Sequence, residues 1–197
     1  MIVPLFPLQS VLFPGGRLSL RIFETRYMDM ASACMKEGSP FGVCLIAEGQ
    51  EVGTAAKPHP VGTLANIAEW DMPQLGLLQI TAQGSERFRV RRHWVETSKL
   101  LRAEIEVDAE DPALPVPEPY RLLVSLLRAM MAGLSDKGLA PPAPYRYDDA
   151  TWVGMRLAEV MPVPALAKQK LLEVDDALDR LEILYRFLSD KGLLPKV

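Results

Sequence analysis

Hydrophobic and polar positions follow two different periods along the chain. In its first two thirds, residues 2–6, 18–22 and 41–47 form short apolar or alternating runs. Residues 101–108 alternate cleanly, which predicts a strand with Leu101, Ala103, Ile105 and Val107 facing inward. Two further runs cover residues 61–70 and residues 75–90, the latter as two strands or one long strand bent near Gly84. Glycine and proline turns separate these runs, so we expect a small barrel or a folded sheet.

One helix interrupts this β-rich part, and further helices follow it. Tyr27, Ala31 and Cys34 share one helical stripe, which predicts a helix over residues 25–37 that ends at Gly38. Beyond residue 117 the apolar positions recur at helical spacing. The predicted helices there cover residues 118–133, 153–161 and 165–172, followed by a last helix that starts at residue 174 and is ended by Gly192, with a loop over residues 133–144.

A proline-rich connector marks the change of period. Prolines at 112, 115, 117 and 119 forbid regular structure. We therefore predict a β-rich domain over residues 1–115 and a helical subdomain over residues 118–197, in the α+β class. A chain of 197 residues buries about 70% of its unfolded surface on folding. A core of that size is stable without disulfide bonds or a structural metal.

Charge and composition narrow the function classes. The chain has 22 basic and 25 acidic residues and a net charge of −3, without the basic excess of a general nucleic-acid binder. No apolar run approaches a membrane span and no leader pattern opens the chain, so we expect a cytoplasmic protein. Two cysteines, Cys34 and Cys44, and two histidines exclude a disulfide scaffold and most Cys/His metal sites. We expect two buried free thiols, no metal and no cofactor.

Several segments, read in order, carry a resemblance to a known family. The N-terminal ones are VPLFPL (3–8), FPG (13–15), LSLRIFETRY (18–27), FGV (41–43), VGTLA (61–65) and GSERFRV (84–90). The C-terminal ones are LAEVMP (157–162), KQKLLE (168–173) and RLE (180–182). Together they resemble the N-terminal domain of Lon proteases in its stand-alone bacterial form. Thr25 stands where many members of that family have proline.

The resemblance implies both a fold and a role. The fold is a PUA-like β-barrel followed by a helical bundle, and in full Lon enzymes this region helps to capture unfolded or tagged protein substrates. The sequence shows no Gly-x-Ser-x-Gly motif of a serine hydrolase. Residues 133–139 have the glycine spacing of a phosphate-binding loop, but Leu139 stands in place of its lysine. We therefore expect a non-enzymatic module, associated with proteolysis, that binds unfolded protein segments, a peptide or a protein partner. An unrecognised hydrolase remains a minor alternative, and the oligomeric state is left open.

Six residues are candidates for contact with such a partner. Arg21, Glu24, Arg26 and Tyr27 lie at the junction between a predicted strand and the first helix. They either line a groove at the barrel mouth or lock the helix through local ion pairs and hydrogen bonds. Met72 lies in a predicted loop next to Trp70, which ends the preceding run, and both are candidates for exposed apolar contact.

A second surface offers an alternative function. Arg87, Arg89 and Arg91 alternate with Phe88 and Val90, which predicts three arginines on the solvent face of one strand, and Arg92 extends the basic stretch. As a patch for anionic partners these residues favour an RNA-associated PUA-like module. The competing interpretation is a solvated strand face paired with Glu104 and Glu106 on the next strand.

Overall fold

The structure is a computed structural model that describes residues 1–109, 112–136, 140–141 and 143–194. It contains two compact units, Met1–Ala109 and Glu110–Val197. The first unit holds β1 (Ile2–Leu8), β2 (Arg17–Ile22), α1 (Thr25–Glu37), β3 (Phe41–Glu48), β4 (Lys57–Gln74), β5 (Leu77–Val95) and β6 (Leu101–Val107). The second holds the 3-10 turn η1 (Glu118–Tyr120), α2 (Arg121–Ser135), α3 (Ala150–Val160), α4 (Ala165–Glu173) and α5 (Ala177–Asp190).

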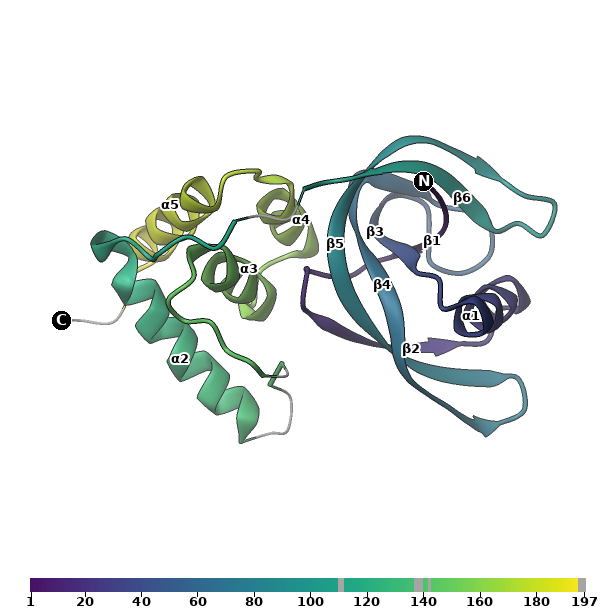
Figure 1. The fold of residues 1–197 in the computed structure, drawn as a ribbon, viewed down its shortest axis with the longest axis horizontal. Coiled ribbons are helices and arrows are strands. Elements are labelled where there is room, and N and C mark those ends of the chain that lie inside the picture. Colours follow the sequence, from purple (N-terminus) through teal and green to yellow (C-terminus); the bar gives the residue numbers. More distant parts are fainter. Residues whose placement is uncertain (110–111, 137–139, 142, 195–197) are drawn as a thin grey trace. The chain divides into compact units, whose positions relative to one another are not determined.

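The strands of the first unit form one sheet that closes on itself. The order is β2-β5-β4-β3-β1-β6, and β6 also pairs with β5 (Figure 1). The long strand β5 makes this possible, because Leu78 to Gln83 pair with β2 whereas Phe88 to Val95 pair with β6. The result is a barrel with β2 left at an edge. The predicted α+β class, a barrel followed by helices, is confirmed.

Strands β4 and β5 form one long hairpin that turns at Gly76, where φ is +82°. The predicted ends were too early, since β4 runs on to Gln74 and β5 to Val95, whereas the alternative of one long strand through Gly84 is confirmed. Met72 therefore lies in a strand, and its predicted place in a loop was wrong. A register shift between Asp71 and Gln74 lets the strand continue past Pro73.

Helix α1 covers one end of the barrel core, and its predicted span is confirmed. Tyr27, Met30 and Cys34 pack in one buried cluster with residues of β1, β3 and β5. The rings of Phe6 and Tyr27 stack with centroids 4.0 Å apart. Val107 was predicted to face inward but is 39% exposed, because the buried alternation of β6 stops at Ile105.

The second unit packs its helices around leucines at helical spacing. Leu123 and Leu127 of α2, Leu157 of α3 and Leu181 of α5 are fully buried. The last helix begins at Ala177 and not at residue 174, because the Asp176 carboxylate accepts from the backbone N–H groups of Leu178 and Asp179. Helix α2 continues to Ser135, two residues beyond its predicted end. Residues 137–139 and 142 of the predicted loop lie outside the described residues.

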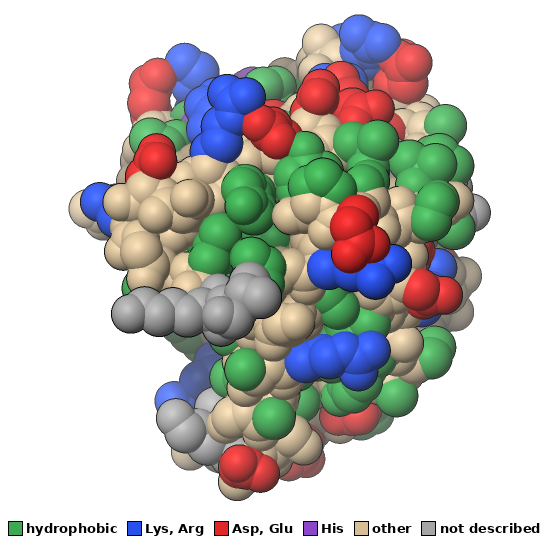
Figure 2. Space-filling view, turned by 90° about the vertical axis from the view of Figure 1, so that its left-hand side faces the viewer, with side chains coloured by type: hydrophobic (Ala, Val, Ile, Leu, Met, Phe, Trp, Pro, Cys, Tyr) green, Lys and Arg blue, Asp and Glu red, His purple; other side chains and the backbone are tan. Residues whose placement is uncertain are grey.

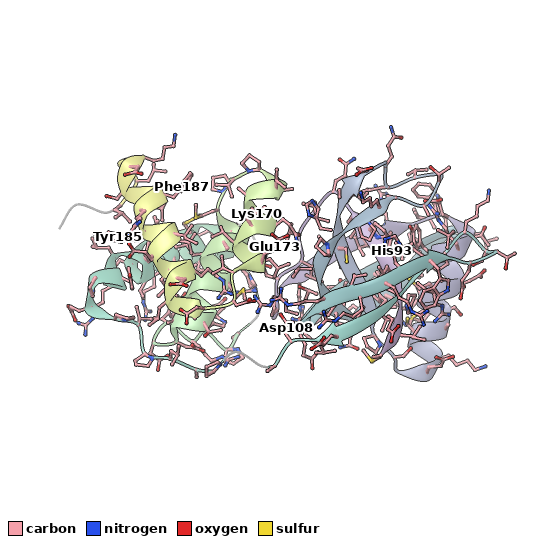
Figure 3. The ribbon with its side chains drawn as sticks, turned by 90° about the horizontal axis from the view of Figure 1, so that it is seen from above. His93, Asp108, Lys170, Glu173, Tyr185 and Phe187 are labelled. Carbon is pink, nitrogen blue, oxygen red and sulfur yellow. The ribbon has the colours of Figure 1, made fainter. Side chains whose placement is uncertain are left out.

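The surface of the second unit mixes apolar and charged side chains. Ile183 and Phe187 of α5 are partly exposed. Figure 2 shows hydrophobic groups interspersed with basic and acidic ones on this face. On α4, Lys170 and Glu173 form an ion pair of 2.8 Å (Figure 3). Within the described part of the chain, no helix is both long and apolar enough to cross a membrane.

Candidate functional site

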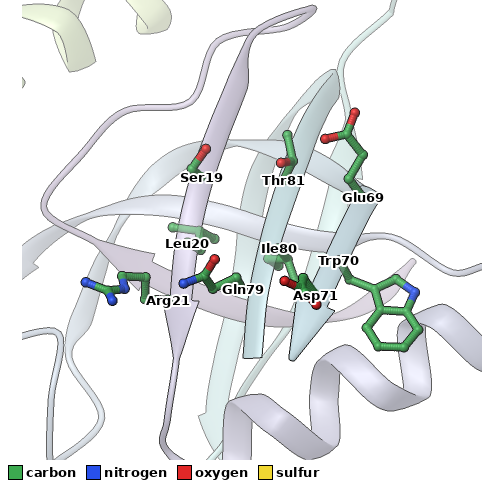
Figure 4. A pocket seen from close by; sticks show the side chains of 9 residues that line it. All are labelled: Ser19, Leu20, Arg21, Glu69, Trp70, Asp71, Gln79, Ile80 and Thr81. Atoms are coloured by element: carbon green, nitrogen blue, oxygen red, sulfur yellow. The ribbon is translucent and has the colours of Figure 1, made fainter. Parts of the chain in front are cut away.

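An open hollow of about 410 Å³ lies on the part of the sheet built by β2, β5 and β4. Strand register arranges its lining in three rows that each cross the three strands. The rows are Ser19–Thr81–Glu69, Leu20–Ile80–Trp70 and Arg21–Gln79–Asp71 (Figure 4). The site is thus assembled from three segments that are far apart in the sequence.

The alternation of strand residues explains the polarity of this hollow. Ile80 is buried and Leu20 is half-buried, and both pack with the barrel core. The residues before and after them must point to the opposite face. Figure 4 shows Ser19, Thr81 and Glu69 pointing to the same side. The face therefore presents hydroxyl, amide and charged groups side by side.

Opposite charges balance across the hollow. Arg17, next to it on β2, donates to Gln83 Oε1 at 2.8 Å and lies 3.7 Å from the Glu69 carboxylate. Arg21 is exposed, and none of the ion pairs among the described residues includes it. Asp71 lies in the same row as Arg21. Such a face can form hydrogen bonds and ion pairs with a ligand that itself carries both donors and acceptors.

Trp70 borders the hollow on β4, with 62% of its surface exposed. Met72 lies two positions further along the same strand and is also exposed. Trp70 pairs with Ile80, so its ring lies on the other face of the sheet from Glu69 and Asp71 and offers a large apolar contact area at the margin of the hollow. The structure thus brings Arg21 and Trp70, two of the predicted contact residues, to one site.

The other predicted residues at the strand–helix junction hold the fold together. Arg26 is buried, pairs with the Glu24 carboxylate at 2.9 Å and donates to the Lys99 carbonyl oxygen at 3.0 Å. Its guanidinium carbon lies 4.6 Å from the ring centroid of Tyr27. Burial raises the pKa of the Tyr27 hydroxyl above its usual value. These contacts match the predicted lock on the first helix, whereas Arg21 faces the hollow.

The arginines of β5 contact carboxylates of the neighbouring strand and its end. Arg87 lies 2.7 Å from Asp108, and Arg89 lies 3.1 Å from the same carboxylate. Arg91 pairs with Glu106, and Arg92 pairs with Glu104 at 2.6 Å. The predicted pairing with Glu104 and Glu106 is confirmed. Figure 3 labels Asp108 at the end of β6.

The predicted orientation of these arginines was partly wrong. Arg87 is only 7% exposed, so it does not share a solvent face with Arg91. A register shift between Val90 and Arg92 breaks the simple alternation. Both Arg91 and Arg92 are exposed as a result.

The two cysteines are buried and free, as expected. Complete burial raises the pKa of Cys44 to about 12, and burial also raises the pKa of Cys34. Thiols held in the protonated form are poor nucleophiles and metal ligands. Among the described residues, no group of three or more His, Cys, Asp or Glu side chains is placed to hold a metal ion.

Buried charges in the second unit join helices and serve the fold. Arg156 and Glu159 of α3 form a buried ion pair. Desolvation raises the pKa of Glu159, against the opposing effect of Arg156. Lys168 of α4 donates to the Glu159 carbonyl oxygen at 2.5 Å. Arg180 is fully buried and donates to the Leu171 carbonyl oxygen at 3.1 Å.

Sequence reasoning missed most of the residues that line the hollow. Ser19, Glu69, Gln79 and Thr81 are ordinary polar strand residues and belong to no motif. One signal was present, because polar residues alternate with apolar ones over residues 17–22 and 78–83. That pattern marks two outward faces but does not say that the two strands are neighbours.

Comparisons with known proteins support a single family. The model of the ATP-dependent protease La (LON) substrate-binding domain matches residues 2–190. A crystal structure of a Lon N-terminal domain protein from Xanthomonas campestris is 34% identical, covers 99% of each chain and has a TM-score of 0.79. The N-terminal domain of the Mycobacterium avium complex Lon protease is 17% identical, covers 96% of this chain and 99% of its own, and has a TM-score of 0.63.

At 17% identity, the similarity to the Mycobacterium avium complex domain shows a shared fold alone. A search of curated proteins finds no match. The family match covers nearly the whole chain and concerns a substrate-binding domain. On this evidence the chain belongs to the LON substrate-binding domain family.

Proposed function

We propose that this protein binds extended segments of unfolded or tagged polypeptides at the hollow on β2, β5 and β4, and that it catalyses no reaction on them. The observation that carries the proposal is the lining of the hollow, which combines rows of hydroxyl, amide and oppositely charged groups with an intervening row that ends in the exposed Trp70. Membership of a substrate-binding family supports the same role.

The chemistry of this lining suits a polypeptide of varied sequence. An extended backbone offers N–H donors and C=O acceptors at regular intervals. Ser19, Gln79 and Thr81 can donate to and accept from such groups. Arg21 and Asp71 balance one another in charge, so the face does not demand a strongly acidic or basic ligand. Trp70 adds an apolar anchor of the kind that dominates many interfaces.

Fluorescence anisotropy with labelled β-casein, an unfolded polypeptide, tests this proposal. We expect saturable binding to the full chain, weakened about tenfold by Trp70→Ala, as for a residue that carries about 1.4 kcal/mol of binding. Trp94→Ala is the matched control, because Trp94 lies on the part of β5 that pairs with β6 and outside the hollow. Circular dichroism confirms that each variant is folded.

Two results would contradict the proposal. One is no binding of β-casein even at high micromolar protein. The other is equal loss of binding in the Trp70 and Trp94 variants. A labelled single-stranded RNA in the same assay tests the alternative function. The proposal predicts no RNA binding, because Arg87, Arg89, Arg91 and Arg92 all contact carboxylates.

A further inference from the structure

We infer that the bound segment, where it continues beyond the hollow, joins the barrel as an added β-strand along the free edge of β2, and that this part of it alternates apolar with acidic residues. This inference rests on the proposed function and names its binding mode and its preferred substrate class. Addition of a strand to an exposed sheet edge is a recurring way to bind extended peptides.

The first step is that one edge of β2 has no strand beside it. β2 is the terminal strand in the sheet order and pairs with β5 alone. Among the described residues, the backbone of Arg17–Ile22 bonds to β5 and to no loop or other strand. The edge therefore offers unpaired backbone groups to a guest strand.

The second step identifies the residues that direct those groups outward. Gly84 N–H donates to the Gly16 carbonyl oxygen at 2.9 Å, and the Gly84 carbonyl oxygen accepts from the Gly15 N–H at 3.0 Å, so the backbone groups of Gly84 point toward the β2 side of β5. The register is regular from there to Ile22, and in an antiparallel ladder hydrogen-bonded pairs occur at every second residue. Leu18, Leu20 and Ile22 thus bond to β5. The N–H and C=O groups of Arg17, Ser19 and Arg21 point to the free edge.

The third step concerns the side chains that a guest strand meets. Leu18 and Leu20 are only half-buried, although they pack against the barrel core. Apolar residues of a guest on that face would complete their burial. On the opposite face lie the guanidinium groups of Arg17 and Arg21, and Arg21 has no ion-pair partner among the described residues. A guest with carboxylates at those positions gains favourable cross-strand pairs.

The same charges disfavour a second copy of this chain as the guest. An antiparallel pair of two β2 strands centred on Ser19 would place Arg17 directly opposite Arg21 of the other copy. Like charges in that position destabilise a strand pair. The edge therefore favours an acidic–apolar guest over itself.

A proline at an outward-facing position gives a selective test. Ser19→Pro removes an N–H that points to the free edge and leaves the hydrogen bonds to β5 in place, as edge strands tolerate. Ser19→Ala is the matched control, since it removes the hydroxyl and keeps the N–H. The probe is a fluorescent ten-residue peptide of alternating valine and glutamate. We expect Ser19→Pro to bind it at least about tenfold more weakly than Ser19→Ala, because both variants lack the hydroxyl and only the proline also lacks the N–H.

Amide hydrogen exchange of the unmodified protein provides a test that needs no variant. With the valine–glutamate peptide bound, we expect slower exchange at the amides of Arg17, Ser19 and Arg21. The amides of Leu18 and Leu20 already bond to β5 and should change little. Bound peptide without this alternating protection would overturn the inference.

The outcomes also separate this inference from the proposed function. If β-casein binds wild type and Ser19→Pro equally well, strand addition is wrong while the proposed function stands. If β-casein does not bind wild type at all, both are wrong. If the protein self-associates through β2, so that sedimentation shows a dimer that Ser19→Pro disrupts, the preference for an acidic–apolar guest is overturned.

Discussion

Single residues explain why the sequence motifs shared with the Lon family exist. A Cβ on Gly62 would lie 2.7 Å from Cys44 Sγ and 2.7 Å from the Phe88 ring, and it would also collide with a backbone carbonyl. The neighbouring Thr63 hydroxyl donates to the buried Leu12 carbonyl oxygen at 2.7 Å. The VGT segment (61–63) therefore serves the close packing of the barrel core. It reveals the fold and says little about ligand contacts.

Gly62→Ala is expected to destabilise the protein by about 2–3 kcal/mol, because the added methyl group meets backbone that cannot move aside. Gly133→Ala is the matched control. Its Cβ meets nothing within 4 Å and it lies in helix α2, so it should gain about 0.5–1 kcal/mol. Urea unfolding measures both, and equal effects of the two substitutions would refute this account of Gly62.

Two arginines of β5 should differ strongly in their contribution to stability. Arg87 is buried against Asp108. Arg87→Ala removes this buried ion pair and should lower the free energy of unfolding by about 3 kcal/mol. Arg92 pairs with Glu104 in solvent, and Arg92→Ala should cost less than about 1 kcal/mol. Thermal unfolding of the two variants compares them. A larger loss for Arg92→Ala would show that burial does not govern these pairs.

At the scale of elements, strongly periodic segments were predictable and their ends were not. Helix α1 was predicted correctly because its apolar stripe ends at Gly38, whose φ of +64° suits a helix terminus. The start of α5 was misplaced because the apolar spacing continues back to Val174. The Asp176 cap, and not that spacing, decides where the helix begins.

The Tyr120–Glu182 contact in the second unit predicts a pH dependence. The Tyr120 hydroxyl donates to Glu182 at 2.5 Å, and this bond, with Arg186, holds the pKa of Glu182 below its usual value. A lowered carboxyl pKa adds stability above the unfolded-state value, and this stability is lost as the pH falls through the folded-state value.

Tyr120→Phe should therefore reduce stability near pH 7, and its difference from wild type should shrink below about pH 4. Urea unfolding across this range measures the difference. Tyr185→Phe is the control. It removes the hydroxyl of a tyrosine whose ring packs edge-on against Tyr120, with centroids 5.9 Å apart, and keeps the Tyr120–Glu182 hydrogen bond. A difference that grows on acidification would contradict the assigned direction.

At the scale of the whole molecule, the candidate site shows where sequence reasoning ends. Its residues come from β2, β4 and β5, three segments brought together only by strand register. Arg21 and Trp70 were predicted separately, one for its place before a helix and one as an exposed aromatic residue. The link between them needs the sheet order, which no local pattern contains.

Charge across the whole chain bears on which ligand fits. The net charge is −3, and the four arginines of the alternative RNA patch, Arg87, Arg89, Arg91 and Arg92, all contact carboxylates. Binding of a polypeptide at the balanced hollow should therefore depend only weakly on salt. An RNA-binding surface would instead lose affinity steeply as salt rises.

The most direct measurement is a titration of the isotope-labelled full chain with unlabelled β-casein, followed by nuclear magnetic resonance. Binding to the β2-β5-β4 hollow predicts shifted amide signals concentrated at residues 17–22, 69–72 and 79–81, with the Trp70 indole signal among them. Signals from Arg91 and Arg92 should stay in place. An unchanged spectrum at saturating β-casein, or shifts confined to the second unit, would contradict the account.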